Sequence, residues 1–431
     1  MSQYSNLIRK LDDRASEEKL SLLYGVKGTA LEAQKKRYRA LLENHEKAFH
    51  AEQPVMIFSA PGRTEIGGNH TDHNNGRVLA ASVNLDTLCA ASAREDLQVN
   101  FLSEGYPALT LSLENTDPRA EEEGTTAALI RGVADGMKRA GRKIGGFDAV
   151  VTSTVAGGSG LSSSAALEVM LTGLFDGMYN DFSMPFVERA QISKRAENLY
   201  FGKPSGLLDQ MASAAGGLVT VDFADEQDPK VKALQYDFAA KGYSLVVVGT
   251  GASHADLTDQ YAAIPAEMKA IAACFGQKTL RGISADQLLC KAGELREKCG
   301  ERALLRAFHF VAEDERVPKQ VLALEEDRTE DFLALILESG RSSFMYLQNV
   351  YAPNGDQGLS LALCMAEEML RGKGAWRVHG GGFAGTTLNA VPNGMTDEFV
   401  GRMESVFGEK SCFILDVRPE GAAVVFGSEG K

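Results

Sequence analysis

A run of glycines and serines at residues 157–169, GGSGLSSSAALEV, opens a segment rich in alanine and leucine that has the composition of a helix. Glycine lets a backbone come close to a ligand, and the unpaired N–H groups at a helix start attract anions. The three serine hydroxyls could bind phosphate oxygens or a magnesium ion. The segment matches neither GxxxxGK[ST] nor GxSxG, which argues against a Walker loop and a serine-hydrolase elbow. It predicts either a phosphate-binding loop without a lysine or a serine N-cap on a core helix.

A second polar segment, SAPGRTEIGGNHTDHNNG at residues 59–76, places five chemically active side chains in what we expect to be one loop after a strand. These residues are Arg63, Glu65, His70, Asp72 and His73. The two histidines with Asp72 between them could ligate a metal ion. The surrounding asparagines and glycines suit a hydroxyl-rich ligand held by many short polar groups. The spacing leaves both possibilities open, together with a solvated polar loop.

The segment GGGFAG at residues 380–385 satisfies the pattern G-x-G-x-x-G. A dinucleotide-binding fingerprint must open a helix, whereas the following TTLNAV has the pattern of a strand. We therefore expect a glycine-rich turn between two strands, which brings backbone close to a ligand of the other lobe.

Composition limits the classes of partner. The chain has 431 residues, 44% hydrophobic and 24% charged, which is typical of globular proteins with two or three domains. Its net charge of −13 argues against sequence-independent binding to nucleic acid or anionic membranes. The six cysteines are scattered without a CxxC pair, so neither a disulfide scaffold nor a cysteine zinc site is expected. The sequence shows no signal segment and no run of about 18 apolar residues, so we expect a soluble cytoplasmic protein.

Hydrophobic patterning predicts the elements that position these segments. Strands are expected at residues 55–60, 77–85, 87–93, 147–155, 217–223, 243–250 and 376–391, and in two segments near the C-terminus. Helices are expected at residues 125–141, 165–179 and 186–201, and residues 254–372 are mostly helical. This mixture predicts an α+β protein with an N-terminal helical extension at 1–50, an N-terminal lobe at 51–225 and a C-terminal lobe at 241–431.

In their order and separation, the motifs resemble those of the GHMP kinase superfamily and, within it, of the galactokinase family. The family motif PGRVNLIGEHTDYNGG corresponds to PGRTEIGGNHTDHNNG (61–76), and GSGLSSSA (158–165) matches G-x-G-L-S-S-S-A completely. The GGGFGG-type turn corresponds to GGGFAG. The family's AEN and GxxDQ stretch is found as Ala196-Glu197-Asn198 and GLLDQ (206–210).

The family also has a tyrosine seven residues after a histidine, which corresponds to Tyr261 after His254. The similarity runs from about residue 54 to the C-terminus. It implies a lobe like domain 2 of ribosomal protein S5 followed by a ferredoxin-like lobe. It also implies transfer of the γ-phosphoryl group of ATP to the anomeric hydroxyl of galactose, with Mg²⁺ as cofactor.

The resemblance implies roles for residues of this sequence. Asp209 matches the catalytic aspartate, and Arg63 matches the arginine that favours its ionised form; alone, they could be a helix N-cap and a surface ion pair. The matched magnesium ligands are Ser164 and Glu197, although Glu197 could simply lie on a solvated helix face. The ATP-binding residues are Gly158, Ser159, Gly160, Leu161, Ser162, Ser163 and Ser164. The sugar-binding residues are Asn69, His70, Thr71, Asp72 and Tyr261. His309 and His379 are expected to be structural.

Three alternatives remain open. The first is a galactose and ATP sensor without catalysis, although SSSAA (162–166) is complete here. The second is an anomeric kinase for galacturonate or another modified galactose. It is favoured by Asn69 and His73, which replace the family's glutamate and tyrosine, and by Ser253 beside His254, because an amide and a protonated imidazole can donate to an anion. The third is a metal-dependent hydrolase, for which no motif supplies a third ligand.

Overall fold

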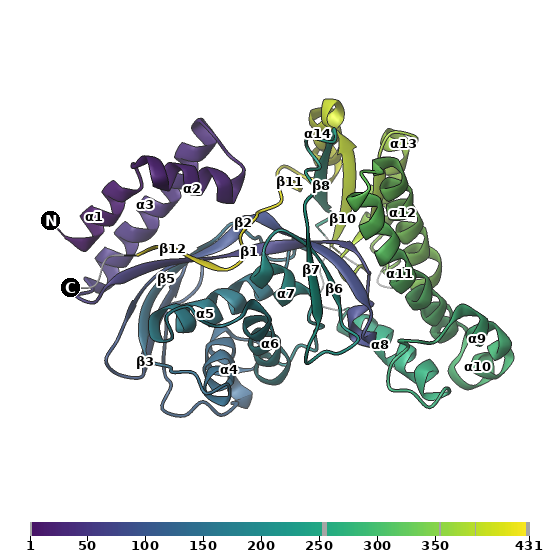
Figure 1. The fold of residues 1–431 in the computed structure, drawn as a ribbon, viewed down its shortest axis with the longest axis horizontal. Coiled ribbons are helices and arrows are strands. Elements are labelled where there is room, and N and C mark those ends of the chain that lie inside the picture. Colours follow the sequence, from purple (N-terminus) through teal and green to yellow (C-terminus); the bar gives the residue numbers. More distant parts are fainter. Residues whose placement is uncertain (1, 252–256, 353–354, 384, 428–431) are drawn as a thin grey trace.

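Two β-sheets organise the computed structural model, which describes residues 2–251, 257–352, 355–383 and 385–427 (Figure 1). The first sheet belongs to the N-terminal lobe and takes one strand from the end of the chain. The second sheet belongs entirely to the C-terminal lobe. The predicted α+β class with two lobes is confirmed.

The strands of the first sheet follow the order β12-β1-β2-β5-β3-β4, and β6 and β7 continue beside β2. They are β1 (Val55–Gly67), β2 (Arg77–Ala93), β3 (Gln98–Ser103), β4 (Leu109–Ser112), β5 (Phe147–Ser153), β6 (Leu218–Asp222), β7 (Lys230–Leu234) and β12 (Ala423–Gly427). β2 pairs with β5 along one half and with β6 along the other. The long hairpin of β1 and β2 therefore extends from the outer edge of the first sheet toward the second lobe.

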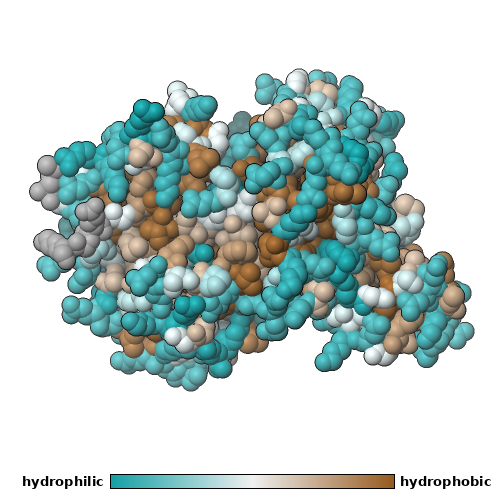
Figure 2. Space-filling model, viewed as in Figure 1, coloured by the Kyte–Doolittle hydropathy of each residue, from teal (hydrophilic) through white to brown (hydrophobic). Residues whose placement is uncertain are grey.

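Helices cover both faces of this sheet, because neighbouring residues of a strand point to opposite sides. Ile57 and Leu88 pack against the N-terminal helices α1 (Gln3–Lys10), α2 (Arg14–Tyr24) and α3 (Thr29–Phe49). Phe58 and Cys89 pack against the other group, which comprises α4 (Thr126–Arg139), α5 (Ser163–Tyr179), α6 (Phe186–Ala196) and α7 (Leu208–Ala215). Figure 1 shows the two groups above and below the strands. On the face drawn in Figure 2, hydrophobic residues gather toward the middle, over the strands.

The second sheet is antiparallel in the order β11-β8-β10-β9. Its strands are β8 (Tyr243–Gly249), β9 (Ala375–His379), β10 (Thr386–Pro392) and β11 (Cys412–Leu415). Its helices are α8 (Thr258–Ala273), α9 (Ala285–Cys290), α10 (Ala292–Cys299), α11 (Glu301–Glu325), α12 (Thr329–Ser342), α13 (Gly358–Leu370) and α14 (Thr396–Phe407). Short helices are η1 (Asp72–Asn74), η2 (Ala120–Glu122), η5 (Asn393–Met395) and the π-helical turns η3 (Glu197–Phe201) and η4 (Ser343–Leu347).

A buried ion cluster around Asp86 joins the N-terminal helices to the first sheet. The Asp86 carboxylate accepts hydrogen bonds from Tyr24, Ser59, Arg37 and Arg418, and it is completely buried. Burial raises the pKa of Asp86, but the two guanidinium groups outweigh that effect and hold the pKa below its ordinary value. Residues from α2, α3, β1 and the segment before β12 thus share one carboxylate.

Three expectations about elements need correction. β1 continues to Gly67, so Arg63 and Glu65 lie on a strand and not in a loop. Residues 77–93 form one strand instead of two, because the chain pairs with β1 on both sides of an irregularity at residues 83–85. The polar stretch between the predicted lobes contains β7, which extends the first sheet. The domain boundaries themselves stay a prediction.

Within the described ranges, no helix is both long and apolar enough to cross a membrane.

Candidate functional site

Asp209 lies where the two polar segments of the N-terminal lobe meet. Its carboxylate forms a two-pronged ion pair with Arg63 of β1, with Nε 2.6 Å from Oδ1 and Nη2 2.9 Å from Oδ2. The Ser162 hydroxyl also donates to Oδ2, at 2.6 Å. Asp209 occupies the first turn of α7 and keeps 31% of its side chain exposed. The carboxylate is therefore fixed in orientation and still reachable by a ligand.

The electrostatics of this trio keep Asp209 ionised. Burial raises the pKa of Asp209, but the Arg63 guanidinium and then the Ser162 hydroxyl outweigh it and hold the pKa below its ordinary value. An ionised carboxylate can accept a proton from a hydroxyl that reaches it. Arg63 also donates to the carbonyl of Gly160, so the same guanidinium holds the glycine–serine loop beside the carboxylate.

The glycine–serine loop forms the turn between β5 and α5. Gly158, Gly160 and Ser162 have φ of 76°, 71° and 62°, which is the left-handed region. A Cβ on Gly160 would lie 2.1 Å from Oγ1 of Thr386 in β10, so only glycine fits against the second lobe there. Ser162 precedes α5 but makes no side-chain hydrogen bond to the helix, because its hydroxyl points to Asp209. The first N–H groups of a 17-residue helix are left for an anion.

Ser164 and Glu197 are adjacent, as expected for two ligands of one ion. Ser164 Oγ donates to Glu197 Oε1 at 3.1 Å, and Lys203 Nζ lies 2.7 Å from the same oxygen. Gln210, next to Asp209 in the chain, donates to Glu197 Oε2 at 2.8 Å and to Glu168 at 3.0 Å. Glu197 is 2% exposed, so the alternative of a solvated helix face does not hold.

The predicted sugar residues divide into two groups, and three of them are partly accessible. Asp72 accepts from the backbone N–H of Leu208 at 3.4 Å, which brings it to the start of α7. His70 Nε2 donates to the carbonyl of Gly381 at 3.0 Å, and Tyr261 Oη donates to that of Gly382 at 2.6 Å. Burial lowers the pKa of His70 to about 4, so this imidazole is neutral at pH 7. The carbonyls of Gly381 and Gly382, which lie between strands β9 and β10 as predicted, thus hold His70 and Tyr261.

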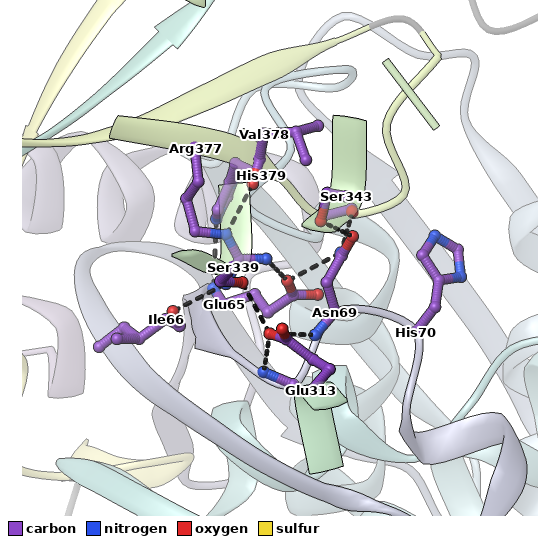
Figure 3. Close-up of polar contacts among 12 residues, drawn as sticks. Glu65, Ile66, Asn69, His70, Glu313, Ser339, Ser343, Arg377, Val378 and His379 are labelled. Atoms are coloured by element: carbon purple, nitrogen blue, oxygen red, sulfur yellow. Dashed lines mark hydrogen bonds and ion pairs between the residues drawn. The ribbon is translucent and has the colours of Figure 1, made fainter. Parts of the chain in front are cut away.

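Asn69 and Thr71 are fully buried, and their polar atoms are engaged with protein. The Asn69 amide donates to Glu65 Oε1 at 2.9 Å and to the Gly380 carbonyl at 2.7 Å, and its oxygen accepts from Ser343 and Asn349 (Figure 3). The Thr71 hydroxyl lies within hydrogen-bond distance of the Gly68 and Arg77 carbonyls. In Figure 3 the His70 side chain points away from this network, whereas that of Asn69 points into it.

Two buried charged groups of the second lobe fix the segment that contains Asn69. Arg377 of β9 donates to Glu65 at 2.5 Å and to the Ile66 carbonyl at 2.8 Å (Figure 3). Glu313 of α11 accepts from the backbone N–H groups of Gly68 and Asn69 at 3.0 and 3.4 Å. The end of β1 is therefore held by ions and hydrogen bonds from the other lobe.

His309 and His379 are structural here, in agreement with the sequence. His309 Nε2 donates to the carbonyl of Asn69 at 3.0 Å, and His379 accepts from the N–H of Glu65 at 3.2 Å. Burial lowers the pKa of both imidazoles. Both hold the backbone of residues 65–69 in place.

Sequence reasoning missed Arg377, Glu313 and Lys203. A signal existed for two of them: Arg377 is a lone charge in the apolar strand WRVH, and Lys203 is a lone cation in the glycine-rich GKPSG. Ser253 and His254 lie outside the described residues. Among the described residues, no group of three or more His, Cys, Asp and Glu side chains is arranged to hold a metal ion.

Comparisons with known proteins add independent findings. A family model described as "Galactokinase galactose-binding signature" matches residues 43–93, and one described as "GHMP kinases N terminal domain" matches residues 128–217. The galactokinase of Streptomyces coelicolor is 30% identical over 380 residues, covering 88% of this chain and 96% of that protein. Human galactokinase is 30% identical over 407 residues, covering 89% and 97%.

Solved structures share the fold. The crystal structure of Lactococcus lactis galactokinase complexed with galactose has a TM-score of 0.78 at 23% identity and covers 92% of this chain and 100% of that chain. Methanococcus jannaschii mevalonate kinase has a TM-score of 0.59 at 14% identity, with 85% and 99% covered. The two lobes seen here are thus arranged as in those kinases.

Proposed function

The chain belongs to the galactokinase family, and on that premise we propose that it transfers the γ-phosphoryl group of ATP to the anomeric hydroxyl of galactose. The products are galactose 1-phosphate and ADP. The observation that supports the proposal is the position of Asp209, which Arg63 and Ser162 hold beside the glycine–serine loop and close to Asp72.

Asp209 accepts the proton of the attacking hydroxyl, and Arg63 stabilises the negative charge that forms there. Residues 158–164 and the start of α5 bind the ATP phosphates through backbone N–H groups. Ser164 and Glu197 fit a magnesium ion, because a hydroxyl and a carboxylate share one location and Mg²⁺ needs few protein ligands beside phosphate oxygens. Magnesium, when bound, would neutralise charge on the phosphates.

We assign the sugar hydroxyls to His70, Asp72 and Tyr261. Asn69 and Thr71 belong to the same site as residues that hold its shape, since their polar atoms contact protein. Because the neutral His70 donates its Nε2–H to Gly381, its Nδ1 can accept from a sugar hydroxyl, and the Asp72 carboxylate can accept from two hydroxyls. A cytoplasmic location remains part of the proposal, as does the absence of nucleic acid and membrane partners.

The contacts of Asn69 favour galactose over galacturonate. Both amide hydrogens of Asn69 are donated to Glu65 and Gly380, so they are not available to a substrate carboxylate. Asp72 and Asp209 would repel such a carboxylate. We therefore expect kcat/KM for galactose to exceed that for galacturonate by at least about tenfold, equivalent to about 1.4 kcal/mol.

A coupled assay for ADP with both sugars, and with N-acetylgalactosamine, arabinose and glucose, tests this expectation. ADP release without sugar gives the background. A higher kcat/KM for galacturonate would replace the galactose assignment with the uronate one, and the absence of ADP release with every sugar would favour a sensor.

The magnesium ligands give a separate prediction. Replacing either ligand, as Ser164→Ala or Glu197→Ala, should raise the magnesium concentration needed for half-maximal activity by about tenfold or more. Galactose binding measured by calorimetry without nucleotide should change little. An equal loss of galactose binding in both variants would indicate that the segment between α5 and η3 has collapsed.

A further inference from the structure

Lys203 is a cation beside Glu197 that has no role in the proposed reaction. Gly202, with φ of 84°, ends the π-helical turn η3 and reverses the chain, so that the backbone N–H of Lys203 donates to the Glu197 carbonyl at 3.1 Å. This φ lies in the left-handed region, which favours glycine at residue 202. The turn returns the Lys203 ammonium to the carboxylate of the residue that starts η3.

The ammonium group lies next to the place where phosphates are expected. It contacts Glu197 Oε1, the oxygen that also accepts from Ser164 in the first turn of α5. The charge of Lys203 also acts on Asp209. Burial raises the pKa of Asp209, whereas Arg63 and, more weakly, Lys203 lower it.

The charges around this point leave Lys203 available for a ligand. Arg63, the other cation beside Asp209, has its guanidinium engaged by both carboxylate oxygens and by the Gly160 carbonyl. Lys203, in contrast, has 56% of its side chain exposed and, among the residues that the structure describes, forms one ion pair, with Glu197. The flexible Lys203 chain would let the ammonium turn from Glu197 toward a phosphate bound at the start of α5, whether or not a magnesium ion took its place on the carboxylate. Lysine is a flexible point charge that commonly binds phosphate.

We propose that Lys203 is a phosphate-binding residue, whose ammonium group leaves Glu197 and binds an oxygen of the nucleotide triphosphate. The proposal rests on the proposed function, because it takes the ligand of this site to be ATP. It supplies the cation that the GSGLSSSA loop lacks, and it brings that cation from a different segment of the chain.

Calorimetric titration of ATP without sugar tests the proposal on the full chain. Lys203→Met removes the charge at constant length and should weaken ATP binding by about tenfold or more, both with magnesium and with a chelator present. Lys203→Arg keeps a charge and should stay within about threefold of the parent. Lys194→Met is the matched control, because Lys194 also pairs with a glutamate, Glu226, but outside the site; it should bind ATP as the parent does.

Each outcome supports or contradicts a contact between Lys203 and the phosphates. Unchanged ATP binding by Lys203→Met overturns the proposal, while sugar-dependent ADP release by the parent would leave the kinase function standing. A loss seen only with magnesium also overturns it, and it assigns Lys203 to orienting Glu197. Loss of ATP binding by both Lys203 variants, with an unchanged melting temperature, supports the proposal and shows that the contact takes an ammonium group and not the larger guanidinium. Lys203-dependent ATP binding without phosphorylation of any sugar would support the phosphate contact and contradict the kinase.

Discussion

Asp209→Asn is expected to lower kcat by at least about 10²-fold while galactose and ATP still bind. The amide has nearly the same shape, and its single oxygen can still accept from Ser162 and from one N–H of Arg63, but it cannot take a proton from the sugar hydroxyl. Steady-state kinetics gives kcat, and calorimetry of each ligand gives the two dissociation constants. Thermal unfolding of the variant should match that of the parent within a few degrees.

The control separates catalysis from the role of an aspartate at a helix start. Asp286 occupies the first turn of α9, is exposed and lies in the helical part of the second lobe. Asp286→Asn removes the same favourable interaction with a helix dipole, worth under about 1 kcal/mol, and should leave kcat unchanged. If Asp209→Asn also turns over at nearly the parent rate, Asp209 is a helix-terminal residue and the base is elsewhere.

Arg377→Met is expected to destabilise the protein by about 3–5 kcal/mol, the usual cost of leaving one partner of a buried ion pair without the other. Glu65 is 5% exposed, and burial raises the pKa of Glu65 while Arg377 counteracts the rise, so its carboxylate depends on this arginine. Glu65 in turn accepts from Asn69. Urea unfolding should give the free-energy change, and KM for galactose should rise more than kcat falls.

Two further variants isolate the buried pair. Glu65→Gln combined with Arg377→Met removes both charges and should recover part of the stability lost in the single variant. Arg402→Met breaks an exposed pair with Glu398 in α14 and should cost less than about 1 kcal/mol. An Arg377→Met protein as stable as Arg402→Met would mean that the ion pair does not hold β1 in place.

The sequence predicted the shape of the glycine–serine loop better than the contacts of the residues expected to bind sugar. The loop at 158–164 is local: its glycines, its serines and the helix behind it are contiguous, so spacing alone predicts their geometry. Arg63 and Asp209 are 146 positions apart, and only the family resemblance placed them together. The predicted strand ended before Arg63 and Glu65, because charged residues are usually exposed and indicate a loop. In the structure both side chains are buried and β1 continues through them.

Asn69 shows why the sugar residues were harder to predict. Its residue type suggests a sugar or anion ligand, but its partners Gly380, Ser343 and Asn349 are 274 to 311 positions away. The residue type sets which hydrogen bonds an amide can make, whereas the packing of the second lobe decides which of them are already made. Lys203 is the opposite case: its partner Glu197 is six residues away, and the left-handed turn at Gly202 brings the two together.

The strand β12 has a consequence for biosynthesis. It pairs with β1 at the edge of the first sheet, and Arg418, just before it, completes the ion cluster of Asp86. Both are translated after the entire second lobe. Until they leave the ribosome, β1 presents an unpaired edge and Asp86 lacks one of its two guanidinium partners. The first lobe of the nascent chain therefore stays open to wrong strand pairing throughout synthesis of the second, and it acquires its native edge only when residues 418–427 fold back onto it.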